Sequence, residues 1–383
     1  MKILFLSHSN NNPNAGASSI FHMLIEGLGG RGHDIDCLHL EDMNIPQQKL
    51  ARRVVDRLYL PQLISRRAMQ EDLSVYDVVM AANGMAWPLF RHLKQRAKRP
   101  LLVSHYHGLT IYDQLANLSE AGLGHHQISS FYRFVSGPNY HRWDMAGLAN
   151  ADLGIVLNRR DLAYIETKAP PGITLAAIKP AIAPRLLEQS KVISPIGARA
   201  PQNIISFSSW GARKGSYYLP GTLRKIREKY PAARLFAGGT GMGAEEFKSH
   251  FGPQDRDAIT VLGFLSREEQ AQLYNDSSIF LFPSVSEGFG LSLPEAQAFG
   301  LAAVTTNTGY AGDYLTDGVD AIVVPLTTEH LAEGVLKLLQ NNEVRCRIAA
   351  NGREVARTLT LDAMAGGYEK AFFDAISKRQ LRW

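Results

Sequence analysis

Two glutamates flank a glycine-rich stretch in the second half of the chain. The sequence EGFGLSLPEAQAFG runs from Glu287 to Gly300 and follows a short apolar run at 278–282. A carboxylate accepts two hydrogen bonds in its plane, which matches neighbouring hydroxyls on a ribose or a hexose. Glycine backbone that leads into a helix presents bare N–H groups, which suit an anionic diphosphate. We therefore expect Glu287 and Glu295 to face a ligand that carries both hydroxyls and phosphate.

Glu295 also has a purely structural interpretation. Ser292 and Glu295 have the spacing of a capping box. Pro294 is tolerated in the first turn of a helix, and Gly300 is typical of a helix end. These residues predict a helix that begins directly after the glycine-rich loop. A capping glutamate needs no ligand, whereas Glu287 caps nothing, so Glu287 is the stronger candidate for chemistry.

Basic residues and a second glycine-rich loop follow two other predicted strands. Arg213 and Lys214 stand in the sequence SWGARKG, after the apolar run 204–208. A guanidinium offers a planar fork and an ammonium a point charge, and both bind phosphate well. Gly239 lies in GGTG after the run 234–237, where glycine lets a phosphate approach the backbone closely. An exposed turn with two cations is the structural alternative for Arg213 and Lys214.

Two histidines follow the predicted strand 101–104, in the sequence HYHG. A histidine at the end of a parallel strand lies where ligands bind, although a lone histidine more often has a structural role. His107 is our candidate for a residue that contacts the ligand. His105 is the competing candidate, because a shift of two residues keeps the same face of a strand.

These residues depend on strands and helices that alternate along the chain. Short apolar runs separated by amphipathic stretches indicate βαβ units with parallel strands. In such sheets, ligands bind beyond the carboxyl ends of the strands, which is where the candidates lie. Strands are predicted at 3–6, 35–40, 78–81, 101–104, 153–157, 204–208, 234–237, 259–262, 278–282, 302–305 and 321–324, and helices at 20–28 and 218–229.

The strand pattern starts afresh in the second half, so we predict two domains. A chain of 383 residues is too long for one ordinary core. The predicted N-terminal domain covers 1–183 and the predicted C-terminal domain covers 203–360. Between them, 184–202 is the predicted linker, because it is rich in proline and has little periodicity. The amphipathic end, 361–383, is expected to form a helix that crosses back onto the N-terminal domain.

Together these motifs resemble the retaining GT-B glycosyltransferases, in particular the large family 4, also called glycosyl transferases group 1. The segment 283–300 is similar to that family at almost every residue. The sequences AGAS at 15–18 and RGH at 31–33 resemble the family's first loop and the boundary after its first helix. The resemblance covers nearly the whole chain. It implies two Rossmann-like, doubly wound parallel-sheet domains that face a central cleft.

The resemblance also implies roles for the candidate residues, with the acceptor on the N-terminal domain and the donor on the C-terminal one. The catalytic residues would be His107, Glu287, Arg213 and Lys214. Many members carry an arginine five residues before the lysine; Ser209 stands there in this chain, so Arg213 would take over that role on the departing diphosphate. The donor-binding residues would be Gly16, Gly239, Leu265, Gly288, Phe289, Gly290, Leu291 and Glu295.

The implied reaction transfers a sugar, with retention of configuration, from a UDP- or GDP-sugar to a hydroxyl group. The acceptor would be a glycan, a glycolipid or a small molecule, and the setting would be bacterial cell-surface polysaccharide or glycoconjugate synthesis. The sequence offers no convincing nucleophile for a covalent intermediate, so we favour attack from the face that the diphosphate leaves. No cofactor and no essential metal are expected besides the nucleotide-sugar co-substrate.

Composition and charge fit an ordinary globular enzyme. Apolar residues make up 45% of the chain and charged residues 20%, which excludes disorder as the main state. No signal peptide or membrane span is evident, so a cytoplasmic location is expected. Basic residues mixed with apolar ones at 49–67 and 91–99 indicate peripheral contact with an anionic membrane or an acidic acceptor; a solvated helix face is the alternative. No nucleic-acid partner is expected.

Other classes of protein fit fewer of these residues. A glycoside hydrolase could use Glu287 and Glu295 as its carboxylate pair, but it would need neither the glycine loop nor the basic pair. A metal-dependent transferase needs an Asp-x-Asp site, and the sequence DID at 34–36 lies at the entry of a strand. A nicotinamide-dependent dehydrogenase needs Gly-x-Gly-x-x-Gly after the first strand, where this chain is polar. A non-catalytic relative that binds nucleotide or glycan stays open.

Overall fold

The structure is a computed structural model that describes all residues except 13–15, 44, 46–47, 264 and 381–383. The chain forms two compact units. The first comprises Met1–Leu118, Gln127–Ala181 and Leu361–Trp383, and the second comprises Ser119–His126 and Ile182–Thr360. The second unit therefore includes a short piece from the first half of the sequence.

The first unit is built on a six-stranded parallel sheet. Its strands are β1 (Lys2–Leu6), β2 (Asp34–Leu38), β3 (Val78–Ala82), β4 (Leu101–His105), β5 (Leu153–Val156) and β6 (Thr174–Ala177). Their order in the sheet is β2-β1-β3-β4-β5-β6. Every residue of β3 and β4 is buried, because helices cover both faces of a parallel sheet. Accordingly β3 is apolar throughout and β4 is apolar up to Val103, before Ser104 and His105 at its carboxyl end.

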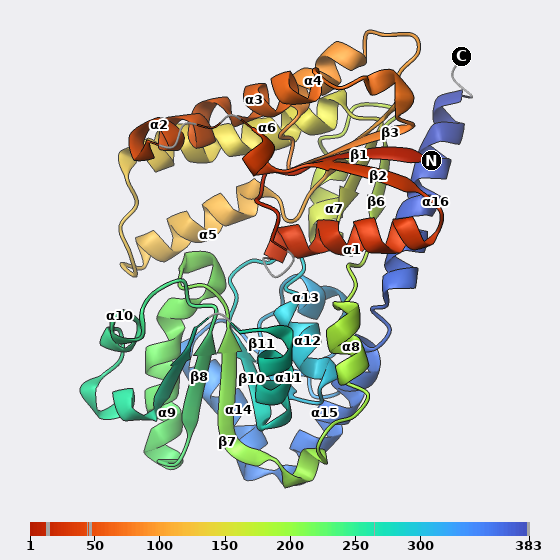
Figure 1. Ribbon diagram of the computed structural model, residues 1–383. Coiled ribbons are helices and arrows are strands. Elements are labelled where there is room, and N and C mark those ends of the chain that lie inside the picture. Colours follow the sequence, from red (N-terminus) through yellow and green to blue (C-terminus); the bar gives the residue numbers. More distant parts are fainter. Residues whose placement is uncertain (13–15, 44, 46–47, 264, 381–383) are drawn as a thin grey trace. The chain divides into compact units, whose positions relative to one another are not determined.

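Helices cover both faces of the first sheet. They are α1 (Gly16–Gly30), α2 (Lys49–Val54), α3 (Leu60–Ala68), α4 (Trp87–Leu93), α5 (Thr110–Gly122), α6 (Gly137–Asn150), α7 (Arg159–Glu166) and α16 (Leu361–Gln380). Helices α3, α4 and α6 lie on one face, and α1 and α16 lie on the other (Figure 1). The C-terminal helix packs closely on α1, since a Cβ added to Gly27 would lie 3.0 Å from the Cβ of Ala365. Arg31 and His33 also bind Glu369 of α16.

The second unit has a six-stranded parallel sheet of its own. Its strands are β7 (Ala200–Phe207), β8 (Arg234–Gly238), β9 (Ile259–Leu262), β10 (Ser277–Phe282), β11 (Ala302–Thr305) and β12 (Ile322–Val323). Their order is β12-β11-β10-β7-β8-β9. Strand β10 therefore lies beside β7, although β8 and β9 come between them in the sequence. The loops that follow β7 and β10 consequently leave the same edge of the sheet side by side.

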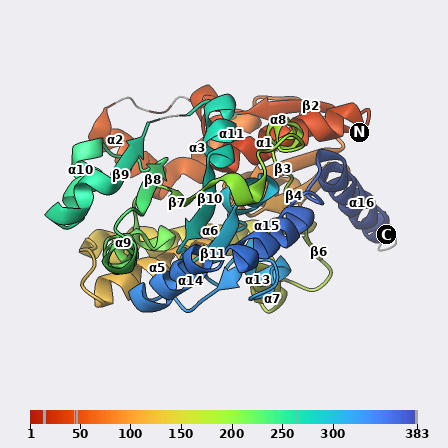
Figure 2. The same ribbon diagram turned by 90° about the horizontal axis from the view of Figure 1, so that it is seen from below.

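Helices also cover the second sheet. They are α8 (Pro184–Gln189), α9 (Leu219–Lys229), α10 (Ala244–Ser249), α11 (Arg267–Asn275), α12 (Ser292–Ala298), α13 (Tyr310–Tyr314), α14 (Thr328–Gln340) and α15 (Asn342–Ala356). Helices α9 and α14 lie side by side on one face, and α11 lies on the other (Figure 2). Ile204, Ile279 and Val335 are fully buried in the core between sheet and helices.

The two parallel sheets confirm the predicted α/β fold class, and each predicted strand is present within a few residues. Strand β6 was not predicted. It is four residues long and only half-buried, so it lacks the apolar run that marks the central strands. The stretch 184–202 lies within the second unit, where it forms α8 and the start of β7. Of the helices described here, none is long and apolar enough to cross a membrane.

Candidate functional site

The basic loop after β7 is joined to the acidic loop after β10. The short 3-10 helix Ala212–Lys214 ends at Gly215, which has φ 61°. A Cβ at Gly215 would lie 1.8 Å from the carbonyl oxygen of Pro283, so only glycine allows the two loops to approach this closely. The carbonyl of Arg213 accepts hydrogen bonds from the N–H groups of Val285 and Ser286, at 2.9 and 3.2 Å. The two loops therefore form one structural element.

Glu287 lies in this element as a buried carboxylate between two cations. Its side chain is only 4% exposed. Lys214 Nζ lies 2.6 Å from Oε1, Arg213 Nη1 lies 3.6 Å from Oε2, and the hydroxyl of Ser284 donates to Oε1 at 2.8 Å. Burial alone would raise the pKa of Glu287, but the two cations and the hydroxyl hold it below its ordinary value. Glu287 is therefore ionised at neutral pH.

The backbone of the loop 288–291 is held in place by glycines. Gly290 has φ 87°, a conformation that favours glycine. A Cβ at Gly309 would lie 2.6 Å from the carbonyl oxygen of Phe289, and the N–H of Tyr310 donates to that same oxygen at 2.8 Å. Within the described part of the chain, the N–H groups of Phe289, Gly290 and Leu291 have no acceptor. The loop thus presents fixed donors that a ligand can use.

The prediction that Ser292 and Glu295 form a capping box is wrong. Helix α12 is capped by Leu291 without a side-chain hydrogen bond, because Ser292 is already helical and its hydroxyl donates to the carbonyl of Phe207. Glu295 turns instead to α11, where Gln270 Nε2 donates to Oε2 at 3.2 Å and Arg267 Nη1 lies 3.6 Å from Oε1. Capping therefore does not account for this carboxylate.

Glu295 is buried, and its electrostatic environment differs from that of Glu287. Burial raises the pKa of Glu295, and Arg267 and Gln270 oppose only part of that rise. Gln270 is held in turn by Tyr274, because its amide also donates to the Tyr274 hydroxyl at 2.9 Å. The two glutamates of the motif are thus fixed by different elements, one by the β7 loop and one by α11.

Two further predicted residues lie at loops of the same sheet. Gly239 follows β8 with φ 66°, and a Cβ there would contact the ring of Phe207 at 3.6 Å. Leu265 is half-buried and directly precedes Ser266, which caps α11. A capping box does form here, with reciprocal bonds between Ser266 and Glu269. Helix α11 therefore begins directly after the loop of Leu265 and carries the two side chains, Arg267 and Gln270, that contact Glu295.

The remaining predicted residues belong to the first unit. Gly16 is the first residue of α1; Ala15, quoted with it, is outside the described residues. The ring of His107 packs at centroid distances of 4.5 Å from His105 and 5.0 Å from Phe21. Both ring nitrogens of His107 are buried and have no hydrogen-bond partner among the described residues. They are therefore able to bind a ligand.

His105 has a different environment, because Tyr368 of α16 occupies its Nε2 at 2.6 Å and both side chains are fully buried. Burial lowers the pKa of His105 to about 3 and holds that of His107 well below its ordinary value. Both imidazoles are neutral at physiological pH. The C-terminal helix thus contributes a side chain that contacts His105, whose ring packs against that of His107.

Sequence reasoning did not find Ser284, Arg267 or Gln270. Ser284 stands within the quoted motif, three residues before Glu287, but nothing in the spacing shows that its hydroxyl points at that carboxylate. Arg267 and Gln270 lie on an ordinary amphipathic helix far from the motif in the sequence. Only the packing of α11 beside α12 brings them to Glu295.

Carboxylates elsewhere do not gather into a metal site. Asp34 and Asp36 stand at the start of β2, and Lys2 lies 3.8 and 3.5 Å from them. No group of three or more histidine, cysteine, aspartate or glutamate side chains that could hold a metal ion occurs in the described ranges.

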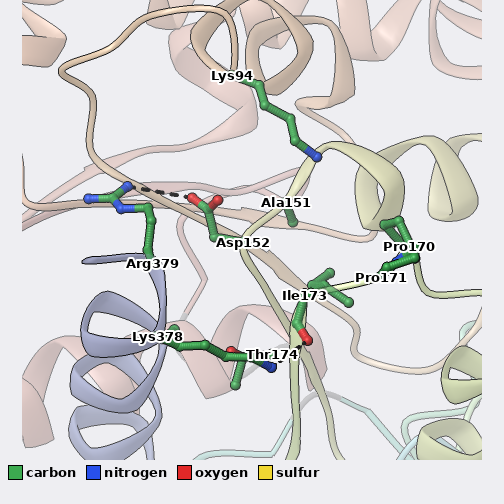
Figure 3. A pocket seen from close by; sticks show the side chains of 11 residues that line it. Lys94, Ala151, Asp152, Pro170, Pro171, Ile173, Thr174, Lys378 and Arg379 are labelled. Carbon is green, nitrogen blue, oxygen red and sulfur yellow. Dashed lines mark hydrogen bonds and ion pairs between the residues drawn. The ribbon is translucent and has the colours of Figure 1, made fainter. Parts of the chain in front are cut away.

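A small cavity of the first unit lies away from the candidate residues. It has a volume of about 140 Å³ and is lined by Lys94, Asp152, Ile173, Lys378 and Arg379, among others (Figure 3). Its wall includes the residues at the amino ends of β5 and β6, which is the edge of the sheet opposite to His107. Arg379 and Arg99 both bind Asp152 there. The cavity is therefore separate from the site described above.

Comparison with known proteins bears on the fold and the family. Residues 197–355, a segment that holds Arg213, Lys214 and Glu287, match the family model for glycosyl transferases group 1. A D-inositol 3-phosphate glycosyltransferase from Mycobacteroides abscessus is 28% identical over 235 residues, which cover 58% of this chain and 50% of that protein. The chain thus spans about half the length of this relative.

Solved structures share the fold over almost the whole chain. Sucrose-phosphate synthase from Thermosynechococcus elongatus aligns with a TM-score of 0.73 and 17% identity, covering 98% of this chain and 100% of that one. The Anabaena protein Alr3699/HepE, solved with UDP and glucose, aligns with a TM-score of 0.66 and 15% identity, covering 98% and 100%. At these identities the likeness establishes the fold.

The two parallel sheets and these structural neighbours define the GT-B class of glycosyltransferase folds. Within that class, residues 197–355 are similar to the glycosyl transferases group 1 family.

Proposed function

We propose that the chain transfers a sugar from a nucleotide diphosphate sugar to a hydroxyl group of an acceptor, with retention of configuration. The observation that carries this proposal is the buried, ionised Glu287 between Lys214 and Arg213. Beside it, the N–H groups of Phe289, Gly290 and Leu291 have no acceptor among the described residues. A sugar with several hydroxyls suits the carboxylate, and a diphosphate suits the cations and the backbone donors. The family match of the same segment supports the assignment.

In this proposal the cations and the loop stabilise the departing diphosphate. Lys214 and Arg213 bind its negative charge, which is the charge that grows as the sugar–phosphate bond breaks. Glu287 keeps both cations in place and accepts hydrogen bonds from sugar hydroxyls. The neutral imidazole of His107 hydrogen-bonds the sugar, and Glu295 binds the ribose. The acceptor hydroxyl attacks from the face that the diphosphate leaves, and that phosphate takes the proton.

UDP-glucose is the first donor to test, because Alr3699/HepE was solved with UDP and glucose. The nucleotide sugar is the sole co-substrate that we propose. A thermal-shift screen of UDP, GDP and ADP with their common sugars identifies the donor, and the selected donor is then used in a transfer assay with glycan, glycolipid and small-molecule acceptors. Stabilisation by none of these nucleotides would argue for a non-catalytic relative.

The role of Glu287 is tested with Glu287→Ala and with Glu228→Ala as a matched control, since Glu228 is an exposed glutamate on α9. We expect Glu287→Ala to lose transfer by about 10²-fold or more, as for other interactions with developing charge. Glu228→Ala should retain wild-type turnover. Unchanged turnover of Glu287→Ala with the correct donor would contradict the proposed site.

We also propose that one surface of the first unit contacts an anionic membrane, where a lipid-linked acceptor would be found. Two segments, 52–59 and 131–135, carry both exposed apolar and basic side chains. They are linked, because the guanidinium of Arg57 lies 5.6 Å from the ring of Phe131 and Asn139 donates to the carbonyl of Arg57. The exposed apolar side chains are Val54, Tyr59, Phe131, Phe134 and Val135. The exposed basic ones are Arg52, Arg53 and Arg133, and Arg57 is half-buried.

Apolar side chains among arginines suit the boundary between lipid headgroups and acyl chains. Phe134 is 72% exposed and is the strongest candidate for insertion. The protein should sediment with vesicles that contain phosphatidylglycerol and less with neutral vesicles. Phe134→Ser should weaken this binding, whereas Phe373→Ser, which changes an exposed phenylalanine on α16, should not. Equal sedimentation of both variants would rule out this surface.

A further inference from the structure

A set of buried polar side chains holds the loop that carries His107. The loop comprises residues 107–110 and follows β4 in the first unit. The N–H of His107 donates to Asn83 Oδ1 at 3.3 Å, and Asn83 Nδ2 donates to the carbonyl of Gly108 at 2.8 Å. Asn83 follows β3, the neighbour of β4 in the sheet. Its amide therefore spans the gap between the ends of two adjacent strands.

Two carboxyl groups hold the second half of the same loop. Asp161 of α7 accepts the N–H of Leu109 at 3.1 Å. Asp144 of α6 accepts both the N–H and the hydroxyl of Thr110, at 2.9 and 2.6 Å. Each of the four consecutive residues thus has a backbone group bound by a side chain from another element. We call Asn83, Asp144 and Asp161 the loop clamp.

The backbone at Asn83 is unusual. Among the described residues, Asn83 is the only non-glycine residue with a positive φ, at 45°. Asparagine tolerates this conformation better than most residues, although it remains less favourable than the ordinary regions. The next residue, Gly84, is pressed against α6, since a Cβ there would lie 2.0 Å from the carbonyl oxygen of Trp143. The turn 83–84 is therefore fixed directly beside Asp144.

The carboxyl groups of the clamp are fully buried, which is unfavourable for groups that are charged in water. Burial raises the pKa of Asp144 to about 8 and that of Asp161 to about 6. A tight turn after a strand needs neither a strained asparagine nor two buried acids. The loop that they hold begins with His107, whose two imidazole nitrogens have no partner among the described residues. Unfavourable backbone and buried polar groups of this kind concentrate at functional sites.

We propose that the loop clamp positions His107, so that its imidazole meets the donor sugar during transfer. Asn83 and Asp144 act through His107 and do not touch the substrate themselves. The inference rests on the proposed function, because it requires a ligand for His107.

The test is a double-mutant cycle between Asn83 and His107, measured as transfer from the donor that the nucleotide screen selects. Asn83→Gly keeps the positive φ accessible and removes both amide hydrogen bonds. Asn150→Ala is the matched control, because Asn150 lies on α6 like Asp144 but, among the described residues, its side chain bonds only to Ala146 of the same helix. UDP affinity, measured by calorimetry, reports on the second unit and should be the same in all variants.

We expect Asn83→Gly to lower kcat by roughly 10- to 100-fold, since small displacements of a catalytic group have effects of this size. In the His107→Ala background, Asn83→Gly should lower kcat less than about twofold, because coupled residues are not additive. Asp144→Asn, which keeps an oxygen for Thr110, should retain much more activity than Asp144→Ala.

Two results would overturn the inference alone, and a third would overturn the proposed function together with it. Wild-type kcat in Asn83→Gly, or an equal loss in both His107 backgrounds, would show that the clamp is only structural while transfer itself stands. A wild-type protein that turns over no nucleotide sugar would remove the proposed function, and the role of the clamp with it.

Discussion

Removal of the Lys214 ammonium should destabilise the second unit, because it leaves Glu287 with a weaker partner. Lys214→Met keeps much of the side-chain volume and deletes the charge. At 2.6 Å, and with an effective dielectric constant of about 20, the attraction between Lys214 and Glu287 is about 6 kcal/mol before desolvation is subtracted. Breaking a buried ion pair on one side typically costs about 3–5 kcal/mol. We expect the lower end, about 3 kcal/mol, because Arg213 and Ser284 still face the carboxylate.

The loss of stability in Lys214→Met should be larger at neutral pH than at acidic pH. In the wild type the pKa of Glu287 lies below its ordinary value of 4.5, so its contribution to stability is present at neutral pH and is lost as the pH falls. In Lys214→Met, burial prevails and raises this pKa, so the folded variant takes up a proton and loses stability as the pH rises. The difference between wild type and variant should therefore be small near pH 4 and full at pH 7.

Scanning calorimetry at pH 5 and pH 7.5 measures both effects. For a unit of this size, about 3 kcal/mol corresponds to a fall in Tm of about 6–12 °C at the higher pH. The double variant Lys214→Met/Glu287→Gln should recover most of the loss, since it no longer contains a buried charge without its main partner. A deficit that is the same at both pH values, or a double variant as unstable as Lys214→Met, would refute the assignment of Glu287 as an ionised, paired group.

Three other changes have expected outcomes. Asp144→Asn should reduce the pH dependence of stability. The folded protein retains a proton on Asp144 up to about pH 8, whereas the unfolded chain releases it near 3.8, so the wild type loses stability as the pH rises between these values. If the variant lost as much stability as the wild type between pH 5 and pH 9 in calorimetry, this expectation would be wrong. Gly309→Ala should destabilise the second unit by about 1–3 kcal/mol and weaken UDP binding, because the added Cβ would lie 2.6 Å from the carbonyl oxygen of Phe289. Wild-type UDP affinity of this variant in titration calorimetry would argue against a role of the Phe289 backbone in binding. Tyr368→Phe should lower stability by about 1–3 kcal/mol, since it leaves the buried Nε2 of His105 without its partner; an unchanged Tm would contradict the importance of this bond.

Much of the fold could be predicted from the sequence, because parallel strands buried on both faces form nearly continuous apolar runs. Strand β6 shows the limit of that signal. It lies at the edge of its sheet, none of its four residues is fully buried, and its sequence therefore has no reason to be continuously apolar. Helix α8 begins at Pro184, a residue that the linker prediction treated as a break, although proline fits the first turn of a helix.

Local spacing could not decide which serine caps a helix. Ser292 with Glu295 and Ser266 with Glu269 share the same spacing, but only the second pair forms a capping box. The hydroxyl of Ser292 bonds to the carbonyl of Phe207, which belongs to another strand. A tertiary contact thus overrides a local pattern that is sound in itself. The site partners of Glu295 were missed for the same reason, since they are set by helix packing.

The two glutamates of the motif lie close together in the sequence, but their pKa values are shifted in opposite directions. Glu287 is held with a lowered pKa by cations from the β7 loop, and Glu295 has a raised pKa beside α11. The order of strands explains this, because it places the loop after β10 beside that after β7. In the proposed reaction Lys214 and Arg213 bind the departing diphosphate, so Glu287 both holds these cations in place and competes with the diphosphate product for them.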